Sequence, residues 1–282
     1  MQKYTEEQFE AEFPDSDACL DALFYRRFGG LICCPRCGVV AAQFMRVDGR
    51  KCYACVHCRY QLYPMAGTIF EKSTTPLKLW FRALYAFSVS RNGVSALELE
   101  RKLGVSRKCA WRIGIKIREA MRQDPAMLSG VTEADEAYYG GRRRSSNRFS
   151  NKVPLLGAVE RGGHVRVVVT DQANATNTMR FVKSTIAKGS VLNTDESRLY
   201  YRAPQDYKHH TVAHGNYEFV RDKDYTNTIE HFWGMLKPSL LGTHRSVSKQ
   251  HLQAYVNEAV WKYNHRGEQL FPLLLDAVAQ PV

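Results

Sequence analysis

The hydrophobic pattern of the first half of the chain, after the N-terminal segment, is that of consecutive helices. "TTPLKLWFRALYAFSVSR" opens with a Thr-Pro pair, which favours a helix start. A short helix capped by Ser95 is predicted up to Leu103. Ser106 then caps a longer helix that runs to Arg122. The pattern therefore predicts a helical module over residues 73–123, whose helices are separated by "NGV" and "GV".

The period of the pattern changes beyond residue 130. "VTEADEAYYGG", "VPLLGAVERGG" and "HVRVVVTDQ" are strand-like, and a Gly-Gly hairpin joins the last two. The helix "NATNTMRFVKSTIAK", the strand "GSVLNTDES" and the strand candidate "HHTVAHG" follow. A helix over "YTNTIEHFWGMLK" has an apolar stripe of Ile229, Phe232, Trp233 and Leu236, at the i, i+3, i+4, i+7 spacing. A last helix from about residue 248 to 264 completes the series. The sequence predicts an α/β domain with a mixed sheet over residues 130–268, and a C-terminal tail over residues 269–282.

Composition adds a strong positive charge to this picture. The 282 residues include 40 Lys and Arg against 28 Asp and Glu, a formal net charge of +12. This balance favours a polyanionic partner, with nucleic acid ahead of an anionic membrane surface. No apolar run reaches the roughly 18 residues that span a bilayer. The acidic N-terminal segment contains no apolar stretch typical of a secretion signal, so we expect a cytoplasmic protein with reduced thiols.

Six of the eight cysteines fall within residues 33–58. "CPRC" and "CVHC", separated by 17 residues, have the spacing of a two-knuckle zinc site. Four thiolates can surround Zn²⁺ at about 2.3 Å, and the metal would stabilise a module over residues 1–72 that has little core of its own. Cys52 and Cys55 form an alternative "CxxC" pair, but the pair Cys55 and Cys58 gives the spacing that is more usual in zinc ribbons. The predicted zinc ligands are Cys34, Cys37, Cys55 and Cys58.

The helix that begins after Ser106 has a basic face. Lys108, Arg112 and Lys116 recur at intervals of four residues, and Ile113 lies on the opposite stripe. A short helix, a tight turn and a basic second helix resemble a helix-turn-helix, whose second helix enters the major groove of DNA. The alternative is an ordinary helix pair with a solvated basic face.

A second basic stretch, "GGRRRSSNRFSNK", follows the first predicted strand of the α/β domain. Arg142, Arg143 and Arg144 lie in it and are candidates for clamping a DNA backbone. The alternative is a loop whose charges are merely solvated.

Three acidic residues of the α/β domain could form a metal site. Asp135 lies on a predicted strand, Asp195 at the end of another, and Glu230 on the "YTNTIEHFWGMLK" helix. If the strands are adjacent and the helix packs across them, the three carboxylates meet at one end of the sheet. Such carboxylates repel unless cations neutralise them, and Mg²⁺ prefers oxygen ligands. Two ions about 3.5–4 Å apart can activate an attacking hydroxyl and stabilise the leaving oxygen of a phosphodiester. Lys237, about two turns after Glu230, would then point at a phosphate.

These motifs together resemble the bacterial insertion-sequence DDE transposases with an N-terminal zinc ribbon, the ISXO-like group. The resemblance rests on "CPRCG", "YACVHCRYQLYPMAGTIFEKSTTPLKLWF", "GVSALELERKLGVSRKCAWRIGIKIREAM", "EADEAYYGGRRR", "LNTDES" and "NTIEHFWGMLK", and covers roughly residues 10–265. It implies an RNase H-like catalytic domain in which Asp135, Asp195 and Glu230 match the acidic triad. Lys237 then takes the family's downstream basic position. Asn227 competes as the third ligand, but we favour Glu230 because a carboxylate binds Mg²⁺ better than an amide does.

The function that the resemblance implies is DNA transposition by hydrolysis at 3′ ends followed by strand transfer. The expected cofactors are two Mg²⁺ or Mn²⁺ ions in the catalytic site and one structural Zn²⁺. The expected partner is double-stranded DNA, with at least a dimer assembled on it in association with the nucleoid, and neither a membrane nor a small-molecule substrate. Two alternatives stay open: a non-catalytic, domesticated DNA-binding regulator, and a hydrolytic nuclease of the same fold.

Overall fold

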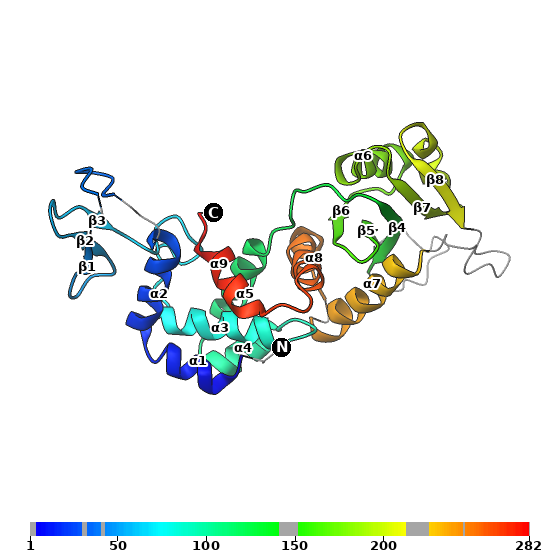
Figure 1. Cartoon of the computed structure of the whole chain (residues 1–282). Coiled ribbons are helices and arrows are strands. Elements are labelled where there is room, and N and C mark those ends of the chain that lie inside the picture. Colours follow the sequence, from blue (N-terminus) through cyan, green and yellow to red (C-terminus); the bar gives the residue numbers. More distant parts are fainter. Residues whose placement is uncertain are drawn as a thin grey trace. The chain divides into compact units, whose positions relative to one another are not determined.

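The computed structural model describes residues 4–29, 33–40, 43–140, 152–212, 226–244 and 246–281. The chain divides into two compact units, Met1–Met121 with Gly267–Val282, and Arg122–Arg266. Figure 1 labels the elements of each unit. Within the described ranges, no helix has the length and apolar character needed to cross a bilayer.

The first unit contains a small antiparallel sheet and a set of helices. Its strands, in the order β1-β2-β3, are β1 (Phe44–Arg46), β2 (Tyr53–Cys55) and β3 (Gln61–Leu62). Its helices are α1 (Glu6–Glu12), α2 (Ser16–Phe28), α3 (Leu77–Val89), α4 (Ala96–Leu103), α5 (Arg107–Ala120) and α9 (Leu270–Ala279). The sheet is joined to α2 because the rings of Phe24 and Tyr53 stack with centroids 3.9 Å apart.

The predicted pair of helices is present as α4 and α5, with the caps expected from the sequence. The Ser95 hydroxyl accepts a hydrogen bond from the Glu98 N–H at 3.1 Å, and Ser106 caps α5 in the same way. Gly104 ends α4 in the left-handed region with φ 64°, a conformation that suits a residue without a Cβ. Binding of DNA by this pair stays a prediction.

The C-terminal segment 269–282, expected to be a tail, instead contains α9. Its apolar residues follow a helical stripe, and Phe271 is buried against Phe9 and Phe13, with ring centroids 5.7 and 5.8 Å away. Pro272 masks this helix in the sequence, but a proline in the first turn removes no intrahelical hydrogen bond. The helix therefore completes the core of the first unit.

The second unit is a five-stranded mixed sheet with helices on both faces. Its strands are β4 (Val131–Tyr139), β5 (Val153–Glu160), β6 (Val165–Val169), β7 (Val191–Asp195) and β8 (Lys208–Val212). Its helices are α6 (Ala175–Thr185), α7 (Asn227–Pro238) and α8 (Lys249–Asn264), with short turns η1 (Arg198–Tyr200), η2 (Ala203–Gln205) and η4 (Ser239–Thr243). The predicted mixed α/β sheet is confirmed, whereas its RNase H-like character stays an expectation.

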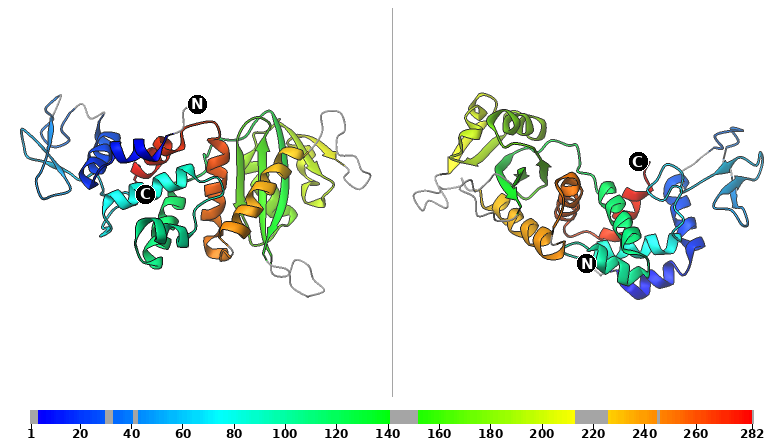
Figure 2. Two further views of the ribbon diagram at one scale, coloured as in Figure 1. Left: turned by 90° about the horizontal axis from the view of Figure 1, so that it is seen from below. Right: turned by 180° about the vertical axis from the view of Figure 1, so that it is seen from behind.

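Strand β4 lies at the centre of this sheet, between an antiparallel neighbour and a parallel one. The order is β6-β5-β4-β7-β8; β4 is antiparallel to β5 and parallel to β7. Alternate side chains of β5 point to opposite faces of the sheet. Leu155 and Val159 belong to the core under α7 and α8, whereas Leu156 and Ala158 belong to the core under α6. Figure 2 shows α7 and α8 crossing one face of the sheet.

The outer edge of β6 is closed by amide side chains instead of a sixth strand. The outward N–H groups of β6 donate to side-chain oxygens at 2.8–2.9 Å: Val165 to Asn264, Val167 to Gln123 and Val169 to Gln253. Gln123 and Asn264 also donate to the carbonyl groups of Val167 and Val165. An open strand edge invites pairing with another chain, so these contacts protect β6.

Candidate metal centres

The four predicted zinc ligands form one cluster. The Sγ atoms of Cys34, Cys37, Cys55 and Cys58 all lie within 4.8 Å of one another. The Cys34 and Cys58 sulfurs are 3.6 Å apart. Tetrahedral Zn–S bonds of about 2.3 Å would space the sulfurs at about 3.8 Å, so this donor set fits Zn²⁺. Cys52 is buried outside the cluster, and the alternative register is not the one used.

Two similar turns bring the cysteines together. The N–H of Gly38 donates to the Cys34 carbonyl at 2.9 Å, and the N–H of Arg59 donates to the Cys55 carbonyl at 3.0 Å. Both donor residues have left-handed backbones, with φ 66° and 61°. Burial raises the pKa of Cys34, but hydrogen bonds from knuckle N–H groups, that of Cys37 first, outweigh it and lower the pKa to about 6. Cys34 thus favours the thiolate that binds a metal, whereas at Cys37 a hydrogen bond from the Val39 N–H is outweighed by burial and the neighbouring cysteines, which raise the pKa to about 11.

In the second unit, Asp135 and Asp195 occupy corresponding positions on adjacent parallel strands. The last aligned pair of β4 and β7 is Glu133 with Asn193, and each aspartate lies two residues further along its strand. Because side chains alternate with period two, both aspartates face the same side as that pair. The fold therefore brings together two acids that 59 residues separate in the sequence.

Helix α7 is attached to β4 at the level of Asp135. The Nε1–H of Trp233 donates to Asp135 Oδ2 at 3.0 Å. The indole lies directly on Gly157, the β5 partner of Asp135, where an added Cβ would come within 2.5 Å of the ring. Only glycine permits this close approach, and Trp233 lies one turn beyond Glu230 on the same helix. All four residues of the predicted apolar stripe are buried: Ile229, Phe232, Trp233 and Leu236.

Glu133 fixes the start of α7 and was not foreseen from the sequence. Its fully buried carboxylate accepts hydrogen bonds from the N–H groups of Thr228 and Ile229 at 2.8 and 3.0 Å. These are orphan donors of the first helical turn, since Thr226 provides no side-chain cap. Arg161 pairs with the same carboxylate at 2.8 Å. Glu133 thus caps a helix through a residue that lies 95 positions later in the chain, a separation that local sequence patterns cannot reveal.

The acids of this site act on one another electrostatically. The pKa of Asp135 is raised to about 6, chiefly by burial and further by the charges of Asp195 and Glu230, against the lowering effect of local hydrogen bonds. Burial, Asp195 and Asp135 also raise the pKa of Glu136 to about 7. A carboxyl group that resists ionisation in this way gains from a nearby cation. The arrangement is one that divalent cations would stabilise.

Two of the carboxylates also accept hydrogen bonds from residues close to them in the chain. Asp195 Oδ1 accepts from the Ser197 N–H at 3.0 Å, and Glu230 Oε1 accepts from the Thr226 hydroxyl at 3.1 Å. Among the described residues, only the four cysteines gather three or more metal-binding side chains into one tight group. Beside Asp195, the buried amide of Asn193 has no hydrogen-bond partner. Carboxylate oxygens and an unsatisfied amide are a donor set suited to hydrated Mg²⁺.

The other predicted site residues have different surroundings. Lys237 and Asn227 are exposed on α7. On α5, Lys108 and Arg112 are exposed, but Lys116 Nζ donates to the Ile69 carbonyl at 3.1 Å and so points partly into the first unit. The residues Arg142, Arg143 and Arg144 lie outside the described residues.

Comparison with known proteins matches both the sheet of the second unit and the cysteine cluster to transposase domains. Residues 127–264 match the ISXO2-like transposase domain, and residues 14–61 match the transposase zinc-ribbon domain. The chain therefore carries an ISXO2-like transposase domain preceded by a transposase zinc ribbon. The zinc-ribbon match and the four-cysteine cluster agree on a structural zinc site.

Two relatives are also similar to this chain. An uncharacterized protein in transposable element ISH50 of Halobacterium salinarum is 28% identical over 246 residues, 79% of this chain and 82% of the relative. An uncharacterized transposase-like protein of Haemophilus influenzae is 24% identical over 102 residues, 36% of this chain and 81% of the relative.

Proposed function

We propose that this transposase cuts DNA at the 3′ ends of an insertion sequence and joins those ends to target DNA. The observation that carries the proposal is the position of Asp135 and Asp195 at one level of adjacent parallel strands, beside the helix that bears Glu230. These three residues are the proposed ligands of two Mg²⁺ or Mn²⁺ ions. When bound, such ions would neutralise the carboxylates and polarise a scissile phosphodiester.

Residues around these proposed ligands would position them and contact the DNA. Trp233 orients the Asp135 carboxylate and ties it to α7, and Glu133 fixes the helix start so that Glu230 is presented on the same side. Lys237, exposed further along α7, is proposed to contact a phosphate near the reacting one. In the first reaction a water attacks and a 3′-hydroxyl leaves. In the second that hydroxyl attacks a phosphodiester of the target, and a new strand end leaves.

Recognition of DNA is assigned to the first unit. The zinc ribbon and the helix pair α4–α5 are the proposed reading modules, and Lys108 and Arg112 are the exposed cations of α5. Because two element ends must be processed together, we propose at least a dimer on DNA.

A joining assay tests the proposed function. The purified chain is incubated with a labelled element end, a target plasmid and Mg²⁺ or Mn²⁺, and cut and joined products are separated on a gel. The proposal predicts both products, and it predicts that Asp135→Asn and Asp195→Asn bind the end but give neither. Cleavage without joining would indicate a nuclease. Binding without cleavage by the parental chain would indicate a regulator, and cleavage by either variant at the parental rate would refute the assignment.

The third ligand is tested in the same assay. Glu230→Gln should abolish cleavage because it removes a carboxylate, while Asn227→Ala should leave cleavage close to the parental rate. The reverse result would assign the third position to Asn227.

A further inference from the structure

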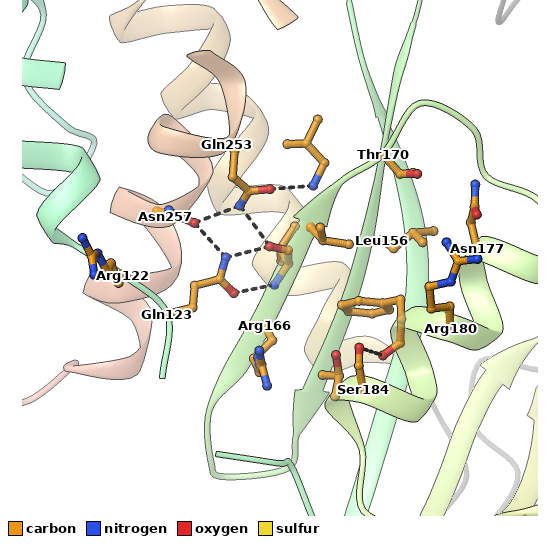
Figure 3. Close-up of a pocket in the computed structure, with 15 residues that line it drawn as sticks. Arg122, Gln123, Leu156, Arg166, Thr170, Asn177, Arg180, Ser184, Gln253 and Asn257 are labelled. Atoms are coloured by element: carbon orange, nitrogen blue, oxygen red, sulfur yellow. Dashed lines mark hydrogen bonds between the residues drawn. The ribbon is translucent and has the colours of Figure 1, made fainter. Parts of the chain in front are cut away.

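A basic groove lies at the β6 edge of the second unit, away from the carboxylates. Its volume is about 550 Å³, and it is formed by β6, α6, α8 and the segment before β4. Figure 3 shows the groove with Arg180, Asn177 and Ser184 of α6 on one side, and Gln253 and Asn257 of α8 on the other. Asp135 lies two strands away, on the face of the sheet that packs against α7. Arg166 alternates along β6 with Val165 and Val167, which face α8, so its side chain lies on the opposite face.

The amide side chains on one wall of the groove are hydrogen-bonded to one another and to β6, which fixes that wall. Asn257 Oδ1 accepts from both Gln123 and Gln253 at 2.8 Å, and these two glutamines also bond to the backbone of β6 (Figure 3). The floor is apolar, with Leu156 and Phe181 buried beneath it. A ligand would therefore meet a preformed surface.

The charge of the groove is uncompensated. Its cations are Arg122, Arg166 and Arg180, and none of the described residues that line it is acidic. Arg122 and Arg180 are exposed, and within the described ranges neither forms an ion pair. Nearby lysines behave differently: Lys183 and Lys188 both pair with Asp206, at 2.8 and 3.0 Å.

We propose that this groove binds the phosphodiester backbone of duplex DNA at a site separate from the carboxylates. Guanidinium groups match phosphate oxygens with two parallel hydrogen bonds, and three of them along one groove suit a polyanion better than a single phosphate ion. Contacts with the backbone carry no sequence information, so the groove would hold any duplex. The identity of the polyanion rests on the proposed function, but the binding itself does not require cleavage.

The salt dependence of binding tests the proposal with the full chain and a short duplex of arbitrary sequence. The double variant Arg122→Ala/Arg180→Ala removes two exposed cations without disturbing a buried contact. It should lower the slope of log affinity against log salt by about 1.8, since each phosphate contact contributes about 0.9. Arg122→Lys/Arg180→Lys should keep the parental slope because the charge stays. An unchanged slope in the alanine variant would overturn the proposal.

A matched control separates the groove from the general charge of the protein. Lys188→Ala/Lys208→Ala also removes two cations, one shortly before β7 and one at the start of β8, and should leave the slope within about 0.5 of the parental value. An equal fall in both double variants would overturn a specific groove.

Cleavage kinetics distinguish this inference from the proposed function. The groove variant should need more DNA for half-maximal cleavage and reach the parental rate at saturation. A fall in the saturated rate with unchanged DNA requirement would contradict the groove. If Asp195→Asn still cuts DNA, the proposed catalytic site fails, while the salt slopes decide the groove independently.

Discussion

The zinc ribbon and the carboxylate site are both sets of metal ligands, but the chain assembles them differently. The four cysteines come from two short turns, and their sulfurs already lie within 4.8 Å of one another. The acids come from β4, β7 and α7, and each is held by a hydrogen bond of its own. In the ribbon the metal completes a fold with little core. In the sheet a well-packed fold comes first, and the cations would draw the ligands together.

Removal of zinc should have the largest effect, because the zinc ribbon depends on its metal for folding whereas the carboxylate site does not. Cys34→Ser should lose bound zinc and unfold the ribbon, since metal binding contributes about 10 kcal/mol or more in such modules. Zinc content and limited proteolysis of the full chain would measure this. Cys33→Ser, an exposed neighbour outside the cluster, is the matched control and should retain the metal. Equal zinc loss in both variants would contradict the ligand assignment.

Loss of the Glu133 cap should be the next largest effect and would test whether the fold presents Glu230. Glu133→Ala leaves Arg161 without its buried partner carboxylate, so we expect a loss of about 3–5 kcal/mol in the free energy of unfolding. Glu133→Gln keeps an acceptor for α7 and should lose less. Denaturant unfolding measures the stability, and the Mg²⁺ titration of cleavage measures the site.

The control for Glu133 is another buried ion pair. Glu258→Ala breaks the contact with Lys262 on α8 and should lower stability without changing the Mg²⁺ requirement. If both variants shift the Mg²⁺ requirement equally, Glu133 has no special role in placing α7.

The bond between Trp233 and Asp135 should have a smaller effect, confined to the site. Trp233→Phe keeps an aromatic ring on Gly157 but removes the N–H that orients the carboxylate. We expect the half-saturating Mg²⁺ concentration for cleavage to rise about 10–100-fold, as for the loss of a group that supports a metal ligand. Trp261→Phe on α8 should not change this concentration. An unaltered Mg²⁺ titration in Trp233→Phe would show that the bond is not used.

The smallest expected effect is on the pH dependence of stability. The raised pKa values of Asp135 and Glu136, about 6 and about 7, mean that the folded protein holds these protons more tightly than the unfolded chain. The resulting stabilisation is complete below the ordinary pKa values of about 4 and is lost progressively as the pH rises from there through the folded values of about 6 and 7. Thermal unfolding in magnesium-free buffer without a chelator should show a midpoint that falls by a few degrees over this range. Asp135→Asn should flatten the curve, and added Mg²⁺ should reverse the fall at pH 7.

The comparison also explains how far the sequence could be interpreted. The cysteine spacing, the caps at Ser95 and Ser106 and the apolar stripe of α7 depend on neighbours within a few residues, and the structure has them as predicted. The site requires partners that the sequence does not reveal, such as Gly157 under Trp233. The roles of Asp135, Asp195 and Glu230 in catalysis stay a prediction.

Two basic residues of α5 also show that a local sequence pattern does not determine whether a side chain is exposed. Arg118 lies on the helix that was expected to present cations, yet it is 2% exposed and donates to the Val94 carbonyl. Lys116 donates to a carbonyl in the same unit. A helical pattern gives the angle of a side chain around its axis, but the position of neighbouring segments decides whether that angle meets solvent.

The amide seal on β6 has a consequence for how copies of this gene decay. Three side chains, from Gln123, Gln253 and Asn264, stand where a neighbouring strand would otherwise be. A missense change at any of them would bare part of a valine-rich strand edge, and identical molecules would then adhere through it. We expect the product of such a copy to precipitate more readily, although every acidic ligand and every cysteine is still encoded.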